Sequence, residues 1–147
     1  VQWATDMDNE SDSKFAPVIN DGLVVLTNGV RVVNTSPHPF VFDDGTVVEP
    51  CGVALNAQFV ETHYATSSEG VQFVRTDKVP TEDGLEFVSA AKGLEVLLLG
   101  SAIAVEAYGF PVVGCIPTPE TAGRGTPPAD RRVQSERFNS HNGNRAQ

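Results

Sequence analysis

Histidine and cysteine, the side chains that most often carry chemistry, are few and widely spaced in this sequence. The three histidines are His38, His63 and His141, and no pair has the short spacing that places two imidazoles on one face of a helix or hairpin. Cys51 and Cys115 lack the paired spacing of a zinc site. The sequence therefore predicts no metal site and no cofactor, with a cluster formed only by folding as the alternative.

Nucleophile and phosphate motifs are equally absent from the sequence. Ser36, Ser89 and Ser101 stand outside any G-x-S-x-G elbow, and Gly123-Arg124-Gly125 is not followed by a helical pattern. A catalytic pair of either cysteine with a histidine would be supported only by the presence of both residue types, because no motif links them. We therefore expect no catalytic residues and a non-enzymatic protein.

Four acidic residues alternate near the start of the chain, at Asp6, Asp8, Glu10 and Asp12. This spacing resembles the first half of a calcium loop, but Ser11 stands where the turn glycine belongs and no glutamate closes the loop. A solvated acidic segment is the favoured interpretation.

The most individual motif is Asn34-Thr35-Ser36-Pro37-His38-Pro39. Pro37 and Pro39 fix their own φ angles and push Ser36 and His38 into extended conformations, so the segment should form a rigid corner in which Asn34 and Ser36 bond to nearby backbone. Two readings stay open: a braced connection between strands, or a ligand site that uses His38.

Strand patterns provide the elements that position this corner. Residues 23–27 and 30–34 flank the turn dipeptide Asn28-Gly29 and predict a β-hairpin. Residues 40–42 and 46–50 flank Asp43-Asp44-Gly45 and predict a second hairpin.

Further along the chain, residues 53–66 and 71–79 alternate well enough for strands. A short helix is expected within residues 90–100, capped by Ser89, and residues 102–108 and 112–116 suggest a final hairpin, although helix stays open for 102–108. The fold class is accordingly mainly β, a small barrel or sandwich of hairpins with one short α-helix.

The composition predicts one core with an extended arm at each end. The expected divisions are an acidic N-terminal arm over 1–20, a β-rich core domain over 21–117 and a Pro/Gly-rich C-terminal arm over 118–147. Apolar anchors through which the arms could bind neighbours are Trp3, Phe15, Val133 and Phe138.

Charge narrows the range of partners. The net charge is −9, which disfavours direct contact with nucleic acid or an anionic membrane. It also suggests a halophilic source, with an ordinary acidic protein of a mesophile as the alternative. The sequence has no apolar run long enough for a membrane span, and its start is acidic and polar, so we expect neither a span nor a signal peptide.

Both cysteines lie in apolar stretches and are expected to be buried thiols, with a single bridge as the alternative.

The corner motif also carries a family resemblance. It resembles small proteins of tailed viruses and prophages that have a strand ending in Asn-Leu-Thr-Pro-His, a turn, and a strand ending in Pro-Ser-Gly. The corresponding segments here are 34–38, 43–45 and 50–52, with further similarity at 87–89 and 113–115. The chain departs at Thr35, Ser36 and Cys51, and it offers Leu55 or Asn56 where the family often has an arginine.

The resemblance implies a viral setting and no settled activity, and the acidic composition extends this expectation to a haloarchaeal tailed virus. Together with the two arms it leads to the prediction of a virion structural protein, capsid-decorating or head/neck-associated, made in the host cytoplasm and bound to copies of itself and other virion proteins. The alternatives are an intracellular viral protein that binds or hydrolyses a small molecule in a pocket near His38, and an adaptor of the host.

Overall fold

The computed structural model describes residues 14–123 and 125–141. Strands account for 37% and helices for 26%, and a curled sheet forms half of a barrel. The mainly β character expected from the sequence is confirmed. Five strands form the sheet, in the order β1 (Val24–Val25), β2 (Arg31–Asn34), β7 (Leu97–Leu99), β8 (Val112–Pro117) and β9 (Val133–Asn139).

The centre of the sheet is parallel and its edges are antiparallel. β7 lies parallel to both β2 and β8, whereas β1 and β9 run antiparallel to their neighbours. Parallel strands covered on both faces read as continuous apolar runs, which explains the Val-Val and Leu-Leu-Leu segments of the central strands.

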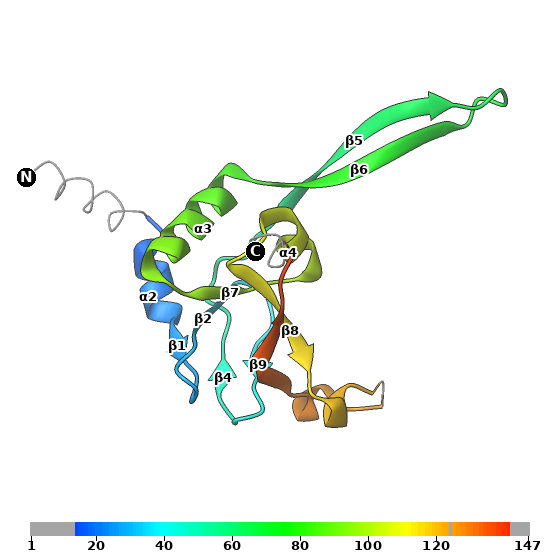
Figure 1. Cartoon of the computed structure of the whole chain (residues 1–147). Helices are drawn as coiled ribbons and strands as arrows, with labels where there is room; N and C mark the ends of the chain where they lie inside the picture. The colour runs from blue at the N-terminus through cyan, green and yellow to red at the C-terminus, as the bar shows by residue number, and fades with distance from the viewer. Residues whose placement is uncertain (1–13, 124, 142–147) are drawn as a thin grey trace, which may run out of the picture.

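Three helices cover one face of the sheet: α2 (Ala16–Gly22), α3 (Glu82–Leu94) and α4 (Ala102–Tyr108) (Figure 1). The Thr81 hydroxyl caps α3 by accepting a hydrogen bond from the Gly84 amide at 3.0 Å, and the Ser101 hydroxyl caps α4 in the same way. Side chains of the helices meet Val33, Leu98 and Val112 of the sheet in the larger of two buried clusters.

The other face of the sheet is covered by a small hairpin and by the curl of the sheet itself. The hairpin consists of β3 (Phe40–Val41) and β4 (Val47–Val48). Its neighbour Phe42, which is fully buried, joins Val32, Leu99 and Val113 in the second cluster. Alternate residues of each central strand thus enter opposite clusters, as strand geometry requires.

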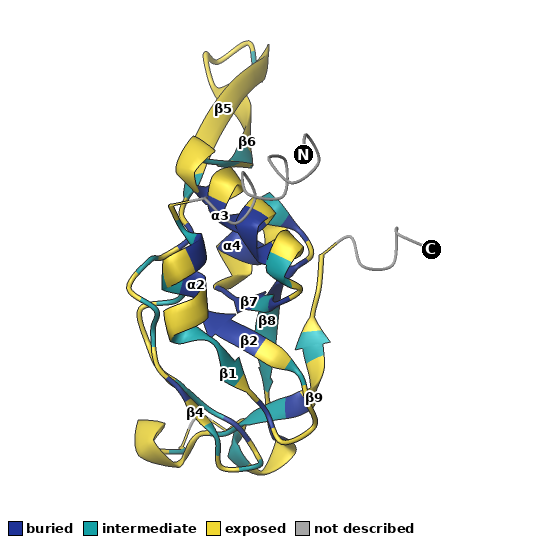
Figure 2. Cartoon of the chain, turned by 90° about the vertical axis from the view of Figure 1, so that its left-hand side faces the viewer, coloured by how far each residue is buried: buried dark blue, intermediate teal, exposed yellow. Residues whose placement is uncertain are grey.

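A long hairpin made of β5 (Ala57–Thr66) and β6 (Gln72–Pro80) projects away from this body (Figure 1). Nearly all of its residues are exposed, and Figure 2 shows the exposed colour along almost its whole length. Both hairpins predicted from the Asn28-Gly29 and Asp43-Asp44-Gly45 turns are also present.

The helices differ from the sequence prediction. One short helix starting after Ser89 was expected, but α3 starts at Glu82 and has Ser89 in its interior, and residues 97–99 form β7. Residues 102–108 form a helix, so the final hairpin is wrong and the helical alternative is right. An apolar run such as Val96–Leu99 fits a helix or a buried parallel strand equally well, and periodicity alone cannot separate them.

The described parts of the two arms are also structured. The first arm contributes the start of α2, whereas residues 1–13 lie outside the described range. After Pro117 the chain forms two 3-10 turns, η1 (Pro119–Thr121) and η2 (Pro128–Asp130), and then β9. The described part of the segment expected to be a Pro/Gly-rich arm thus contains a strand of the sheet, because pairing with β8 supplies the order that its composition lacks.

Candidate functional site

The corner that the sequence singled out is held by the Asn34 side chain, which is fully buried. Its amide donates to the carbonyl oxygens of His38 at 2.7 Å and Val48 at 3.0 Å, and its oxygen accepts from the amide and hydroxyl of Ser36 at 2.9 and 2.7 Å. All four hydrogen-bonding positions of the side chain are therefore used. Asn34 and Ser36 bond to local backbone as expected, and the corner is braced from within.

His38 itself is exposed and lines a wide pocket of about 820 Å³. The pocket lies between the start of β3 and the segment that joins β8 to β9, so it brings the corner together with Arg131 and Arg132. Its walls are otherwise mostly apolar, and they include Pro39, Phe40 and Val133. Sequence reasoning named His38 and Val133 but had no means of finding the two arginines, because they come from a segment expected to be a tail.

The predicted anchors lie at different places, and three of the four pack on the chain's own core. The rings of Phe15 and Phe87 have centroids 5.1 Å apart, and those of Phe42 and Phe138 are 6.2 Å apart. Val133 also packs against the second buried cluster. Trp3 lies outside the described residues.

The largest group of exposed apolar side chains lies on the β5–β6 hairpin, at positions that sequence reasoning read as ordinary strands. We call this group the hairpin surface; its members are Phe59, Val60, Tyr64, Val71, Phe73, Val74 and Val79. Both faces take part: Tyr64 and Phe73 share one face, with ring centroids 6.5 Å apart, while the register puts Phe59 and Val74 on the other. The exposed fractions reach 68% at Tyr64 and 60% at Phe59.

The base of this hairpin is clamped by α4. The Tyr108 hydroxyl donates to the carbonyl oxygen of Asn56, just before β5, at 2.6 Å and accepts from the amide of Thr81, just after β6, at 3.1 Å. An ion pair of 3.3 Å joins Lys78 of β6 to Glu106 of α4. The direction in which the hairpin leaves the body is thereby set by one helix.

A second cavity, of about 550 Å³, contains a cysteine and a histidine. Cys115, Glu106 and His141 line it, and burial raises the pKa of the Cys115 thiol to about 12. A thiol that stays protonated at neutral pH is a poor nucleophile. Cys51 and Cys115 are both half-buried and unbridged, so the single-bridge alternative is excluded.

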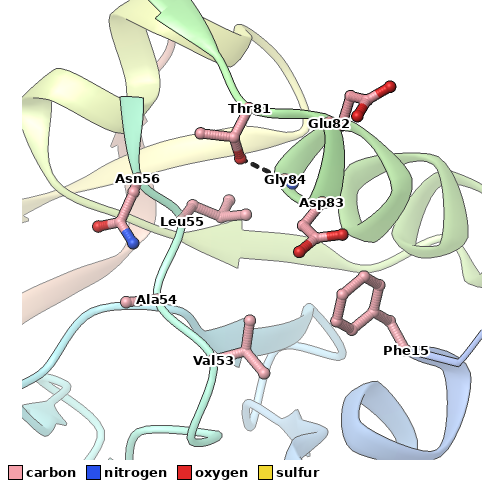
Figure 3. A pocket seen from close by; sticks show the side chains of 9 residues that line it. All are labelled: Phe15, Val53, Ala54, Leu55, Asn56, Thr81, Glu82, Asp83 and Gly84. Atoms are coloured by element: carbon pink, nitrogen blue, oxygen red, sulfur yellow. Dashed lines mark hydrogen bonds between the residues drawn. The ribbon is translucent and has the colours of Figure 1, made fainter. Parts of the chain in front are cut away.

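A third cavity, of about 470 Å³, lies at the start of α3 (Figure 3). Phe15, Val53 and Leu55 form its apolar side, and Glu82 and Asp83 belong to the first turn of the helix. These carboxylates already complement the positive end of the helix dipole, and Asp83 also pairs with Lys14 at 3.3 Å. The cavity thus lies between the segment 53–56 and the start of α3, with Phe15 beside it.

Within residues 14–123 and 125–141, no group of three or more histidine, cysteine or acidic side chains could hold a metal ion. Of the helices in the described part of the chain, none is long and apolar enough to cross a membrane. Comparisons with models of protein families, with curated proteins and with solved structures found no match to this chain.

Proposed function

We propose that this protein is a non-enzymatic assembly component, and that the β5–β6 hairpin is the element through which one copy binds the next. The observation that carries the proposal is the hairpin surface, which exposes aromatic and branched side chains on both faces of a projecting element. Exposed apolar groups of this kind mark sites of protein association.

The backbone of the hairpin supports the same proposal. In the described structure β5 and β6 pair only with each other, so both strands have one free edge along nine to ten residues. A two-stranded hairpin is marginally stable in water, and natural proteins protect long free edges. A second copy offers strands of the same length and apolar groups of the same kind, so two hairpins could complete one four-stranded sheet.

The setting we propose is a tailed-virus particle, in which the protein is a capsid-decorating or head/neck-associated component. The proposal rests on the resemblance to small viral proteins that residues 34–38 and the following turn suggest, which stays a prediction, and on the projecting hairpin. The net charge of −9 favours contacts with other proteins over contacts with packaged nucleic acid. Quantitative mass spectrometry of purified particles should find many copies per particle; absence from them would contradict this setting.

Self-association can be tested on the full chain by sedimentation velocity over a range of concentrations. Replacing Phe59, Tyr64 and Phe73 together by serine should reduce self-association by at least tenfold, because it removes the largest exposed side chains of the hairpin surface. Circular dichroism should be unchanged, since these side chains contribute little to the buried clusters.

A matched control is available elsewhere on the molecule. Val25, Leu85 and Val47 are also exposed apolar residues but belong to β1, α3 and β4, so their joint replacement by serine should leave association unchanged. If the wild-type chain stays monomeric at all concentrations, or if both triple variants behave alike, the hairpin does not have this role.

The second candidate function is small-molecule binding at His38, and the 820 Å³ pocket is the observation that favours it. Among its described lining residues the one hydroxyl is that of Thr121, which accepts from the Arg132 amide at 3.0 Å and contacts the Thr118 hydroxyl at 2.7 Å. The pocket therefore offers binding groups rather than an activated nucleophile. A metabolite retained by the wild-type protein and lost on His38→Ala would favour this candidate.

A further inference from the structure

The His38 pocket is unusual in its charge for a protein with nine excess negative charges. Arg131, Arg132 and the imidazole of His38 line it, and none of its described lining residues is acidic. Asp130, the neighbour of Arg131 in the chain, belongs to the flanking turn η2 and is not part of the lining. An acidic protein thus keeps a local basic site, which would attract a negatively charged partner.

The arginine side chains are partly held in place. Arg132 donates through Nη1 to the carbonyl oxygens of Ala129 at 3.0 Å and Arg131 at 2.9 Å, and the Nε atom of Arg131 donates to the Thr126 carbonyl oxygen at 3.3 Å. Among the described residues no carboxylate pairs with either guanidinium. Guanidinium groups prefer carboxylates, so each keeps the capacity to bind an acidic side chain.

The remaining lining is apolar, so an ideal occupant combines carboxylates with a large apolar side chain. The chain itself contains such a segment outside the described structure. Residues 1–13 hold Trp3 and the alternating acids Asp6, Asp8, Glu10 and Asp12. In an extended conformation the four carboxylates would share one face and Trp3 would lie on the other, so a segment placed between two walls of the pocket could turn its acids to the arginines and its indole to the apolar wall.

We propose that residues 1–13 of one copy dock in the His38 pocket of a neighbouring copy, with Trp3 against the apolar walls and the carboxylates of Asp6 and Asp8 beside Arg131 and Arg132. The inference rests on the proposed assembly function, because it requires two copies to meet. It adds a second contact, from a segment to a pocket, to the contact between hairpins.

The position of the segment favours docking between copies. Figure 1 places α2, which follows residues 1–13, and the β8–β9 end of the sheet on opposite sides of the body. From Lys14 back to Trp3 the chain spans at most about 40 Å when fully extended. Docking within one chain would have to lead the segment round the body, whereas a neighbour can present its pocket directly, and the concentration dependence of docking separates the two cases.

Trp3 is the only tryptophan of the chain, so its fluorescence reports docking in the intact protein. At high concentration its emission should be shifted to the blue, and the shift should disappear on dilution. Replacing Arg131 and Arg132 together by glutamate should abolish the blue shift and weaken self-association roughly tenfold or more. The control is Arg31→Glu with Arg137→Glu, the same charge change on exposed arginines outside the pocket, which should retain the shift.

Reversing the charges on both partners at once controls for variants that lose docking only because they misfold. Asp6→Lys with Asp8→Lys should also abolish the shift, and combining it with the two pocket reversals should restore it. Mixing the pocket variant with the segment variant should restore about half of the signal, because each mixed pair has one intact segment and one intact pocket.

Three outcomes would overturn the inference: a blue shift that does not depend on concentration, which means docking within one chain; an emission unaffected by the pocket reversals; and failure of the exchanged charges to restore it. An anionic small molecule released from the wild-type protein, with Trp3 emission unchanged on its removal, would assign the pocket to that ligand. Failure of the proposed function looks different, since the chain would then sediment as a monomer at every concentration.

Discussion

At the scale of residues, Asn34 is the position on which the corner depends. Its four hydrogen bonds join β2 to the Ser36–His38 turn and to β4, within a site that excludes solvent. The sequence could indicate this residue because asparagine before a proline-rich turn has few other roles. It could not indicate that the second acceptor is Val48, because that contact depends on how the β3–β4 hairpin folds back.

Asn34→Asp should be strongly destabilising. The substitution keeps the shape but removes both donated hydrogen bonds and buries a carboxylate, so we expect a loss of about 3 kcal/mol or more in the free energy of unfolding. Urea denaturation measures the change. Ser36→Ala is the control; it removes one hydroxyl from a half-buried position and should cost about 1 kcal/mol. Equal losses in the two variants would show that Asn34 is not the brace.

Asp44 links the turns of the first two hairpins and should give stability a defined pH dependence. Hydrogen bonds from the Thr46 amide at 2.8 Å and the Thr27 hydroxyl at 2.7 Å hold the pKa of this carboxyl well below its usual 3.8. A lowered pKa in the folded state stabilises the fold above the unfolded value, and that contribution is lost as the pH falls below about 4.

Asp44→Ala should therefore cost about 1 kcal/mol at pH 7, and the difference from the wild type should shrink between pH 4 and lower values. Urea midpoints at pH 7, 4 and 3 test this. Asp43→Ala is the neighbouring control, because its carboxyl makes no hydrogen bond within the described part of the chain. A gap between Asp44→Ala and wild type that stays constant with pH would refute the assignment.

At the scale of elements, turn chemistry could be predicted and strand partners could not. The Asn28-Gly29 and Asp43-Asp44-Gly45 turns are local, and Gly29 and Gly45 have the positive φ angles that such turns need. The β2–β7 pairing, in contrast, joins residues more than sixty positions apart. Strand β9 was missed because its sequence, VQSERFN, has weak apolar alternation and gains its order from β8.

The structure and the sequence predict opposite effects of deleting residues 118–147. A simple tail could be removed without loss of the fold. Here the deletion should unfold the protein, because β9 pairs with β8 and Phe138 packs against Phe42. The Asn28 side chain also donates to the Ser135 carbonyl oxygen at 2.8 Å. Circular dichroism and thermal melting of the truncated chain test this; a cooperative transition near the wild-type temperature would contradict it. Deletion of residues 142–147 is the control.

At the scale of the whole molecule, the excess of acidic residues should make stability depend on ionic strength. The three ion pairs among the described residues join exposed or half-buried side chains, so each contributes little, while nineteen acidic residues face ten basic ones. Mutual repulsion should therefore outweigh the pairs at low ionic strength.

Raising KCl from 0.1 to 1 M should increase the melting temperature, because screening reduces this repulsion over the Debye length, about 10 Å at the lower and 3 Å at the higher concentration. Differential scanning calorimetry measures the effect. A variant with several exposed acids replaced by their amides should respond less. A melting temperature that is constant or falls with salt would argue against a source adapted to high salt.

The order of the strands in the sheet determines which parts of the protein can fold while it is being synthesised. The centre of the sheet pairs β2 with β7, and β8 and β9 follow later in the chain. On the ribosome, the β5–β6 hairpin can form as soon as residue 80 has emerged, because its contacts are local, but the body has to wait for residues 97–139. During that interval the nascent chain would display its most adhesive element before it has a core, so neighbouring ribosomes on one message could begin assembly before either chain is complete.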